Sequence, residues 1–125
     1  MQLFDSNILI YSSKPAFAYL RPLLKAEDAY VSAISVVEVL GYPDLTEDDR
    51  HYHESFFATA DVQPVSDSVI ARTVEVRRLK RRMKLGDALI AATALEFDMT
   101  LMTNNEADFT GLAGLRVENP LKPSP

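Results

Sequence analysis

Short apolar runs alternate with longer helical stretches along the chain, and this alternation constrains the fold more than any other feature of the sequence. Five runs rich in β-forming residues are predicted as strands, at residues 2–4, 29–33, 61–65, 100–103 and 115–119. Four of the stretches between them are predicted as helices, at residues 34–40, 46–58, 66–83 and 89–97. Strands that alternate with helices and have no polar face form a parallel sheet with helices on both sides. We therefore predict a three-layer α/β/α domain with a central, mainly parallel β-sheet.

The length and composition fit one intracellular domain. A chain of 125 residues, 47% hydrophobic and 25% charged, is long enough to bury a core, so we predict a single domain over residues 1–125 with a frayed tail after about residue 119. No apolar stretch approaches the roughly 18 residues that span a bilayer, and no signal segment leads the chain. There is no cysteine, which excludes disulfides, zinc thiolates and cysteine nucleophiles and favours a reducing cytoplasm. We expect a cytoplasmic protein without a membrane partner.

The charge distribution leaves nucleic acid open as a partner. The net charge of −5 argues against it, but six of the 13 basic residues fall in one run, "RRLKRRMK". A local positive stripe can attract a polyanion even when the total charge is negative. The alternative is a solvated helix face with no partner, and the sequence gives both interpretations equal weight. The candidate RNA-binding residues of this run are Arg77, Arg78, Lys80, Arg81, Arg82 and Lys84.

Four acidic residues fall where a parallel sheet places its functional crevice, beyond the carboxyl ends of the strands. Asp5 ends the first predicted strand, and Asp108 comes shortly after the fourth. Glu38 lies in an apolar helix that begins right after the second strand, and Asp87 opens the most apolar helix. Each has an ordinary alternative: Asp5 and Asp87 can cap helices, Asp108 can belong to a turn, and Glu38 can reach solvent or form a salt bridge.

The joint arrangement favours a metal site. Carboxylates crowded at one edge of a sheet repel one another, and divalent cations between them would relieve that repulsion. Oxygen ligands alone point to Mg²⁺ or Mn²⁺ rather than zinc. His51 and His53 are two residues apart on a predicted helix, and we interpret both as surface residues. Metal-binding carboxylates beside a basic stripe suit the hydrolysis of phosphodiesters.

Five segments together resemble the PIN-domain family, and more narrowly its VapC-type ribonuclease toxins from type II toxin–antitoxin pairs. They are "FDSNILIY", "SAISVVEVLGYP", "KLGDALIAATAL", "TNNEADF" and "LRVENP", in order along nearly the whole chain. The segment "GDALIAATAL" is the most specific of them. The resemblance implies a PIN fold and an endoribonuclease that uses Mg²⁺, with Mn²⁺ able to substitute.

The resemblance also implies which residues form the site. Asp5, Glu38 and Asp87 match the three acids of the family's metal site, and Asp108 is the natural match for a fourth catalytic and metal-binding acid. Asn105 stands where some relatives have an aspartate, so it is a second candidate to complete the site. The polar positions that help to order the site are matched by Ser6, Asn7, Thr103 and Asn105.

The resemblance implies two protein partners. Family members form homodimers and are inhibited by a cognate antitoxin, a segment of which lies across the acidic cleft. The apolar stretch at residues 16–24, "AFAYLRPLL", can face an antitoxin, a second subunit or the core of the domain.

Other classes of protein fit the sequence less well. A phosphoacceptor receiver domain needs an acid pair before the first strand and a lysine after the last one; here no acid pair precedes the strand, and Lys122 lies in the tail. With four glycines in the chain, neither a P-loop nor GxGxxG is present. A catalytically silent RNA-binding or protein-interaction domain of the same fold stays open, as does an RNA-processing nuclease unconnected with an antitoxin.

Overall fold

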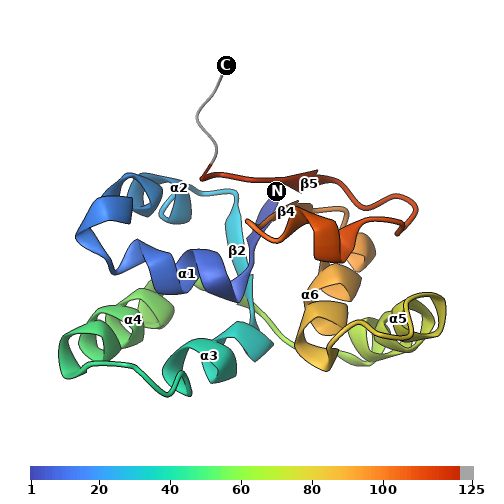
Figure 1. Ribbon diagram of the computed structural model, residues 1–125, viewed down its shortest axis with the longest axis horizontal. Helices are drawn as coiled ribbons and strands as arrows, with labels where there is room; N and C mark the ends of the chain where they lie inside the picture. The colour runs from blue at the N-terminus through green and yellow to red at the C-terminus, as the bar shows by residue number, and fades with distance from the viewer. Residues whose placement is uncertain (122–125) are drawn as a thin grey trace.

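The computed structural model describes residues 1–121 (Figure 1). The elements of this part of the chain alternate as predicted, with two short 3₁₀ helices, η1 and η2, among them. In chain order they are β1 (Gln2–Phe4), α1 (Ser6–Ser12), η1 (Pro15–Leu20), α2 (Arg21–Leu24), β2 (Ala29–Ser32), α3 (Ala33–Leu40), α4 (Glu47–Thr59), β3 (Asp61–Gln63), α5 (Asp67–Leu79), α6 (Leu85–Glu96), β4 (Thr100–Met102), η2 (Glu106–Phe109) and β5 (Val117–Glu118).

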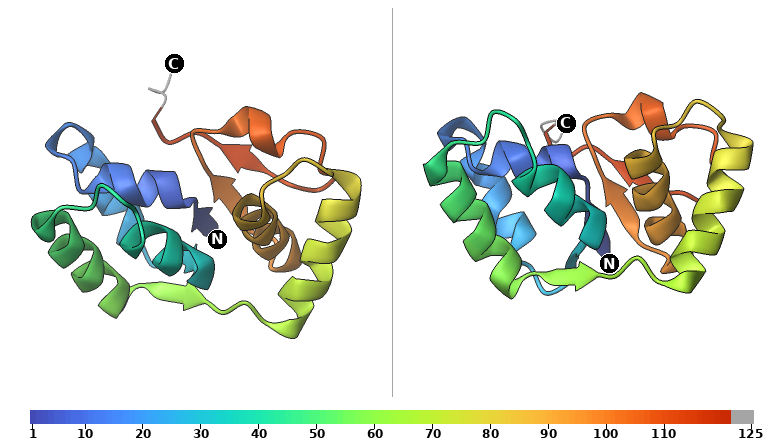
Figure 2. Two further views of the ribbon diagram at one scale, coloured as in Figure 1. Left: turned by 60° about the horizontal axis from the view of Figure 1, so that its bottom comes forward. Right: turned by 90° about the horizontal axis from the view of Figure 1, so that it is seen from below.

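The sheet has the strand order β3-β2-β1-β4-β5, and each neighbouring pair is parallel. Helices α1 to α4 lie on one side of the sheet and α5 and α6 on the other (Figures 1 and 2). The predicted α/β/α architecture is therefore confirmed. The chain runs outward from β1 to β2 and β3, then returns to place β4 and β5 on the other side of β1. This reversal makes the carboxyl ends of β1 and β4 the topological switch point, where such sheets bind their ligands.

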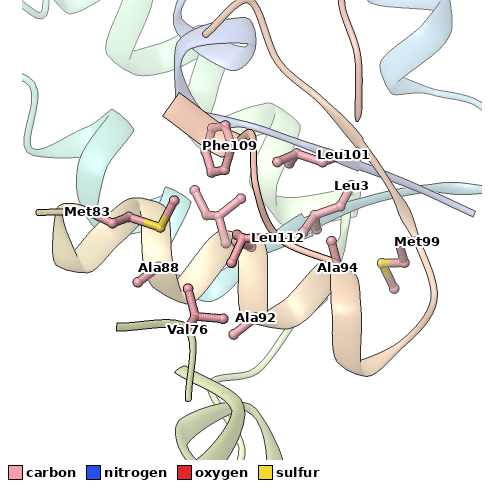
Figure 3. Close-up of a cluster of buried hydrophobic side chains, with 12 residues drawn as sticks. Leu3, Val76, Met83, Ala88, Ala92, Ala94, Met99, Leu101, Phe109 and Leu112 are labelled. Atoms are coloured by element: carbon pink, nitrogen blue, oxygen red, sulfur yellow. The ribbon is translucent and has the colours of Figure 1, made fainter. Parts of the chain in front are cut away.

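Successive side chains along each strand point to opposite faces of the sheet, and this divides the core into two clusters. Leu3 of β1 and Leu101 of β4 point to the α6 side, and the next residues, Phe4 and Met102, point to the α1 side. All four are at most 5% exposed. Figure 3 shows the first cluster, in which the alanines of α6 lie beneath the strand residues. Their small side chains let α6 pack closely on the sheet, as its apolar sequence predicted.

Two boundaries of the predicted helices differ from the structure by four residues and others by one, and α1, η1 and α2 were not among the predicted helices. Helix α5 ends at Leu79 rather than at residue 83, and α6 begins at Leu85 rather than at residue 89. Lys80 leaves the helical conformation, with φ −123° and ψ 82°. Because α6 starts early, Asp87 lies inside its first turn and is not the N-cap; Lys84 takes that position, without a side-chain cap.

The prediction that both histidines lie on the surface is wrong for one of them. His51 is exposed, but His53 is 1% exposed, and neither of its ring nitrogens has a hydrogen-bond partner among the described residues. Burial lowers the pKa of His53 below its usual 6.5. The two side chains point in different directions from α4, as their spacing requires, and the inward one packs edge-on to the Tyr52 ring.

The apolar stretch at residues 16–24 serves both the core and the surface. Leu20 and Leu24 are buried, whereas Tyr19 and Leu23 are 52% and 39% exposed. In the predicted tail, Leu121 packs against the second cluster, and residues 122–125 lie outside the described residues. None of the helices described is long and apolar enough to cross a bilayer.

Candidate active site

Asp5 stands at the centre of the switch point. Its Oδ1 accepts a hydrogen bond from the Ser6 backbone N–H at 2.7 Å, which caps α1, and its Oδ2 accepts one from the Thr103 hydroxyl at 2.8 Å. The carboxylate is thus both a helix cap and a link between the ends of β1 and β4. Asp5 is only 3% exposed. A buried acid in this position costs stability when it is ionised, so its presence calls for a reason beyond capping.

Polar groups after β4 orient the Asp5 carboxylate. The Thr103 hydroxyl accepts a hydrogen bond from the Asn105 backbone N–H at 3.0 Å while it donates to Asp5, so its proton has one direction. Asn105 therefore orders the site through its backbone. Asn7 lies exposed in the first turn of α1. The predicted site-ordering residues thus gather at the Asp5 end of β1 and β4.

Glu38 reaches the same edge from α3. Its Oε1 lies 2.7 Å from the Ser6 hydroxyl, which in turn lies 2.9 Å from Ser35 Oγ. On the other side is α6, where a Cβ at Gly86 would lie 2.5 Å from Glu38 Oε2. The missing side chain at Gly86 therefore lets α6 approach the carboxylate. Sequence reasoning missed both contacts, although the glycine in the first turn of an apolar helix was a visible signal.

The four predicted acids share one electrostatic neighbourhood. Burial raises the pKa of Asp5 from 3.8 to about 6, against the hydrogen bonds from Thr103 and Ser6, and the charges of Asp87 and Glu38 raise it further. Burial also raises the pKa of Asp87, to which the charges of Asp108 and Glu38 add and the charge of Lys84 is opposed. The structure thus brings together acids from the end of β1, from α3, from α6 and from η2, and their negative charges disfavour one another.

These acids fit a hard divalent cation by their donor chemistry. Within residues 1–121, no three carboxylate or imidazole groups form a ready-made ligand set for one metal ion. Mg²⁺ does not require one, because it keeps several waters and binds through one or two carboxylates together with substrate phosphates. The raised pKa values of Asp5 and Asp87 and the close approach of the Glu38 carboxylate to Gly86 agree with a site that accepts positive charge.

A cavity of about 250 Å³ lies beside two of the acids, Asp87 and Asp108. Basic side chains form part of its wall. The other lining residues are Lys80, Arg82, Met83, Lys84 and Ala107. A space lined by both carboxylates and cationic side chains can hold a phosphate and a metal ion together.

The predicted basic run does not form a single surface. Arg82 and Lys84 line the cavity beside the acids, whereas Arg77 and Arg78 line an apolar groove of about 560 Å³ along α5. Arg81 is exposed between them and lines neither. The turn at residues 80–84, where α5 stops, redirects the second half of the run towards the acids.

Comparisons with known proteins agree with this fold. The PIN domain model matches residues 3–115. Ribonuclease VapC10 of Mycobacterium tuberculosis is 33% identical over 119 residues, which cover 84% of this chain and 83% of the relative. A toxin–antitoxin complex from Klebsiella pneumoniae contains a chain with 29% identity and a TM-score of 0.76, over 96% of this chain and 98% of that one. DNA-bound VapBC from Salmonella typhimurium, at 20% identity, shares the fold with a TM-score of 0.79, over 94% and 96% of the two chains.

The fold is an α/β domain with an all-parallel sheet, and because the PIN domain model matches residues 3–115, the chain belongs to the PIN-domain family. Within that family it is a relative of the VapC ribonucleases, since the similarity to VapC10 runs through most of both chains.

Proposed function

We propose that the protein is a metal-dependent endoribonuclease that hydrolyses RNA phosphodiester bonds as the toxin of a toxin–antitoxin pair. The observation that carries the proposal is the buried Asp5, held at the switch point of a PIN fold among the charges of Glu38 and Asp87. Repulsion among these carboxylates destabilises the folded protein when no metal is bound, and a bound cation offsets that repulsion.

Asp5, Glu38, Asp87 and Asp108 would hold Mg²⁺, for which Mn²⁺ can substitute because it accepts the same oxygen ligands. The bound cation supplies positive charge that stabilises the charge developing on the phosphate during hydrolysis. The protein prepares this site in advance: Thr103 orients Asp5, and the Ser6 hydroxyl holds Glu38.

Basic residues beside the acids would hold the RNA backbone. Arg82 and Lys84 line the cavity that contains Asp87 and Asp108, so a phosphate bound there lies next to the acids. Arginine and lysine contacts to phosphate supply most of the sequence-independent affinity for nucleic acid. In this proposal Arg77, Arg78 and Arg81 contribute to longer-range attraction rather than to the cleft.

The proposal includes an antitoxin, a homodimer and a cytoplasmic location. The Klebsiella pneumoniae relative is a toxin–antitoxin complex. Here, three apolar side chains of α5 and the start of α6 are 47% to 56% exposed: Ile70, Val74 and Leu85. They line the groove along α5, and such a face suits a second copy of the chain. The exposed Tyr19 and Leu23 are candidates for antitoxin contact.

The experiment that tests the nuclease is cleavage of a mixed RNA panel by purified protein with Mg²⁺, Mn²⁺ or chelator, alongside Asp5→Asn. Cutting that requires metal and that the variant lacks supports the proposal. If the wild-type protein cuts no RNA with either metal, and antitoxin is verifiably absent, the result favours a catalytically silent RNA-binding or protein-interaction domain.

The dimer is tested separately by sedimentation of Val74→Glu. A charge in the apolar groove should yield monomers, whereas Val65→Glu, outside the groove, should sediment as wild type does. A monomeric wild type removes the dimer from the proposal and leaves the nuclease untouched.

A further inference from the structure

Lys80 connects the turn between α5 and α6 to the segment that carries Asp108. Its Nζ donates hydrogen bonds to the backbone carbonyl oxygens of Asp108, at 3.2 Å, and of Thr110, at 2.5 Å. Both carbonyls lie at the carboxyl end of η2. The last carbonyls of a helix lack partners within the helix, and a cation that binds them is well placed. The ammonium group therefore caps η2 from a different part of the chain.

Among the described residues, three contacts attach the Asp108 turn to the rest of the domain. Phe109 is 2% exposed and belongs to the first core cluster, which Figure 3 shows. Asn119, just after β5, donates from Nδ2 to Glu106 Oε1 at 3.1 Å. Lys80 is the third attachment, and it joins the turn to the connection between α5 and α6. Local bonds from the Asp108 N–H to Asn105 O and from the Thr110 hydroxyl to Ala107 O, both at 3.0 Å, shape the turn itself.

We propose that Lys80 is a positioning residue that fixes the Asp108 carboxylate beside Asp87 and thereby sets the affinity of the site for its cation. Lys80, Asp87 and Asp108 line the same cavity, and the charge of Asp108 reaches Asp87. This role differs from direct RNA binding, because two of the three donors of the ammonium group are already used on backbone carbonyls. The inference rests on the proposed metal-dependent function.

Calorimetric titration of the full chain with Mn²⁺ tests the cation affinity directly. Lys80→Met keeps the apolar stem and removes the donors. Substitution of residues that orient metal ligands commonly weakens metal affinity by about 10- to 100-fold, so we expect Lys80→Met to bind Mn²⁺ about tenfold or more weakly than wild type. Lys80→Arg, which restores two donors, should recover most of the affinity. Lys25→Met removes one exposed positive charge outside the cavity and should bind Mn²⁺ as wild type does.

The same titration in an Asp108→Asn background shows whether Lys80 acts through that acid. If it does, Lys80→Met changes the Mn²⁺ affinity of Asp108→Asn by less than about twofold. An equal loss in both backgrounds means that the lysine acts through the fold at large, and the proposal is overturned. Unchanged Mn²⁺ affinity of Lys80→Met, with a higher KM for RNA and a flatter salt dependence, overturns it in favour of direct RNA binding.

Hydrogen exchange without metal gives a second readout. In chelator, the backbone amides of residues 106–110 should exchange faster in Lys80→Met than in wild type or Lys25→Met, because one attachment of the turn is lost. Equal exchange rates overturn the positioning role. A wild-type protein that binds no Mn²⁺ and cuts no RNA removes the proposed function and this inference together. If the wild type binds Mn²⁺ and cuts RNA, and Lys80→Met binds Mn²⁺ with unchanged affinity, only the inference about Lys80 is removed.

Discussion

Replacing Asp5 by asparagine should stabilise the metal-free protein, although Asp5 is buried and hydrogen-bonded. Its pKa is about 6 in the folded protein and 3.8 ordinarily. At neutral pH the folded state must therefore hold an ionised carboxylate that it disfavours. A difference of about two pKa units corresponds to a penalty of about 3 kcal/mol. Asparagine removes the charge and keeps an oxygen that can accept from the Ser6 N–H.

The substitution also has a cost. The Thr103 hydroxyl donates to Oδ2, and an amide nitrogen in that place cannot accept this bond. Losing it costs about 1 kcal/mol, so the net gain at pH 7 is about 2 kcal/mol. For a chain of this length that is an increase of roughly 8 °C in Tm.

The gain should depend on pH with a definite sign. The stability that protonated Asp5 contributes is fully present below pH 3.8 and is lost as the pH rises through about 6. Asp5→Asn should therefore be no more stable than wild type near pH 4 and more stable above pH 6. Mg²⁺ at 100 times Kd stabilises wild type by about 2.7 kcal/mol, so it should reverse the order at neutral pH if the variant gains less than about 0.7 kcal/mol from the ion, as expected when a ligand is lost.

Urea unfolding in chelator at pH 4, 5, 6 and 7 measures these differences, with Asp44→Asn as a control. Asp44 is exposed between α3 and α4, and its replacement should change stability by less than about 0.5 kcal/mol. An Asp5→Asn variant that is less stable than wild type at pH 7, or a difference that is the same at all four pH values, would refute the reasoning. Asp5 would then be a structural residue.

Three further substitutions test other parts of the structure. Gly86→Ala should leave Tm unchanged or raise it, because alanine favours the helix by about 1 kcal/mol. The same substitution should lower the rate of RNA cleavage about tenfold or more, because the new Cβ displaces Glu38. Equal cleavage rates in wild type and variant would contradict this. Arg82→Gln with Lys84→Gln should weaken RNA binding and reduce the slope of log affinity against log salt by up to about 2, and an unchanged slope means that neither contacts phosphate. His53→Leu should raise the free energy of unfolding by about 1–2 kcal/mol at pH 7, and by more as the pH falls below 6.5, because the buried imidazole is disfavoured further when it is charged; a smaller advantage in acid would contradict the burial argument.

The sequence predicts the elements of this fold better than their arrangement. All five predicted strands occur, some shortened by one to three residues, because apolar β-forming runs report burial directly. Burial does not say which strand lies beside which, so the order β3-β2-β1-β4-β5 needed the structure. The start of α6 was missed because the exposed Leu85 and the adjacent Gly86 break the apolar pattern of the helix.

The candidate site was predictable to the extent that it depends on strand ends. Asp5 and Thr103 are 98 positions apart, yet each directly follows a strand, and the carboxyl-edge rule predicts their meeting. The contact of Lys80 with the Asp108 turn follows no periodicity, because it depends on where α5 stops and where the side chain then reaches. The spacing of His51 and His53 predicts that they point in different directions from the helix, but only the packing of α4 decides which of the two faces inward.

The separation of Asp5 from Thr103 has a consequence for the order of biosynthesis. A ribosome that adds about 5–20 residues per second makes the second partner of this hydrogen bond roughly 5–20 seconds after the first. β1 cannot complete its place in the sheet until β4 has been made, since it pairs with that strand throughout its length. A nascent chain that has not yet reached β4 therefore carries Asp5, Glu38 and Asp87 without Thr103 and Asp108, and the full cluster assembles only after β4 and η2 have been made.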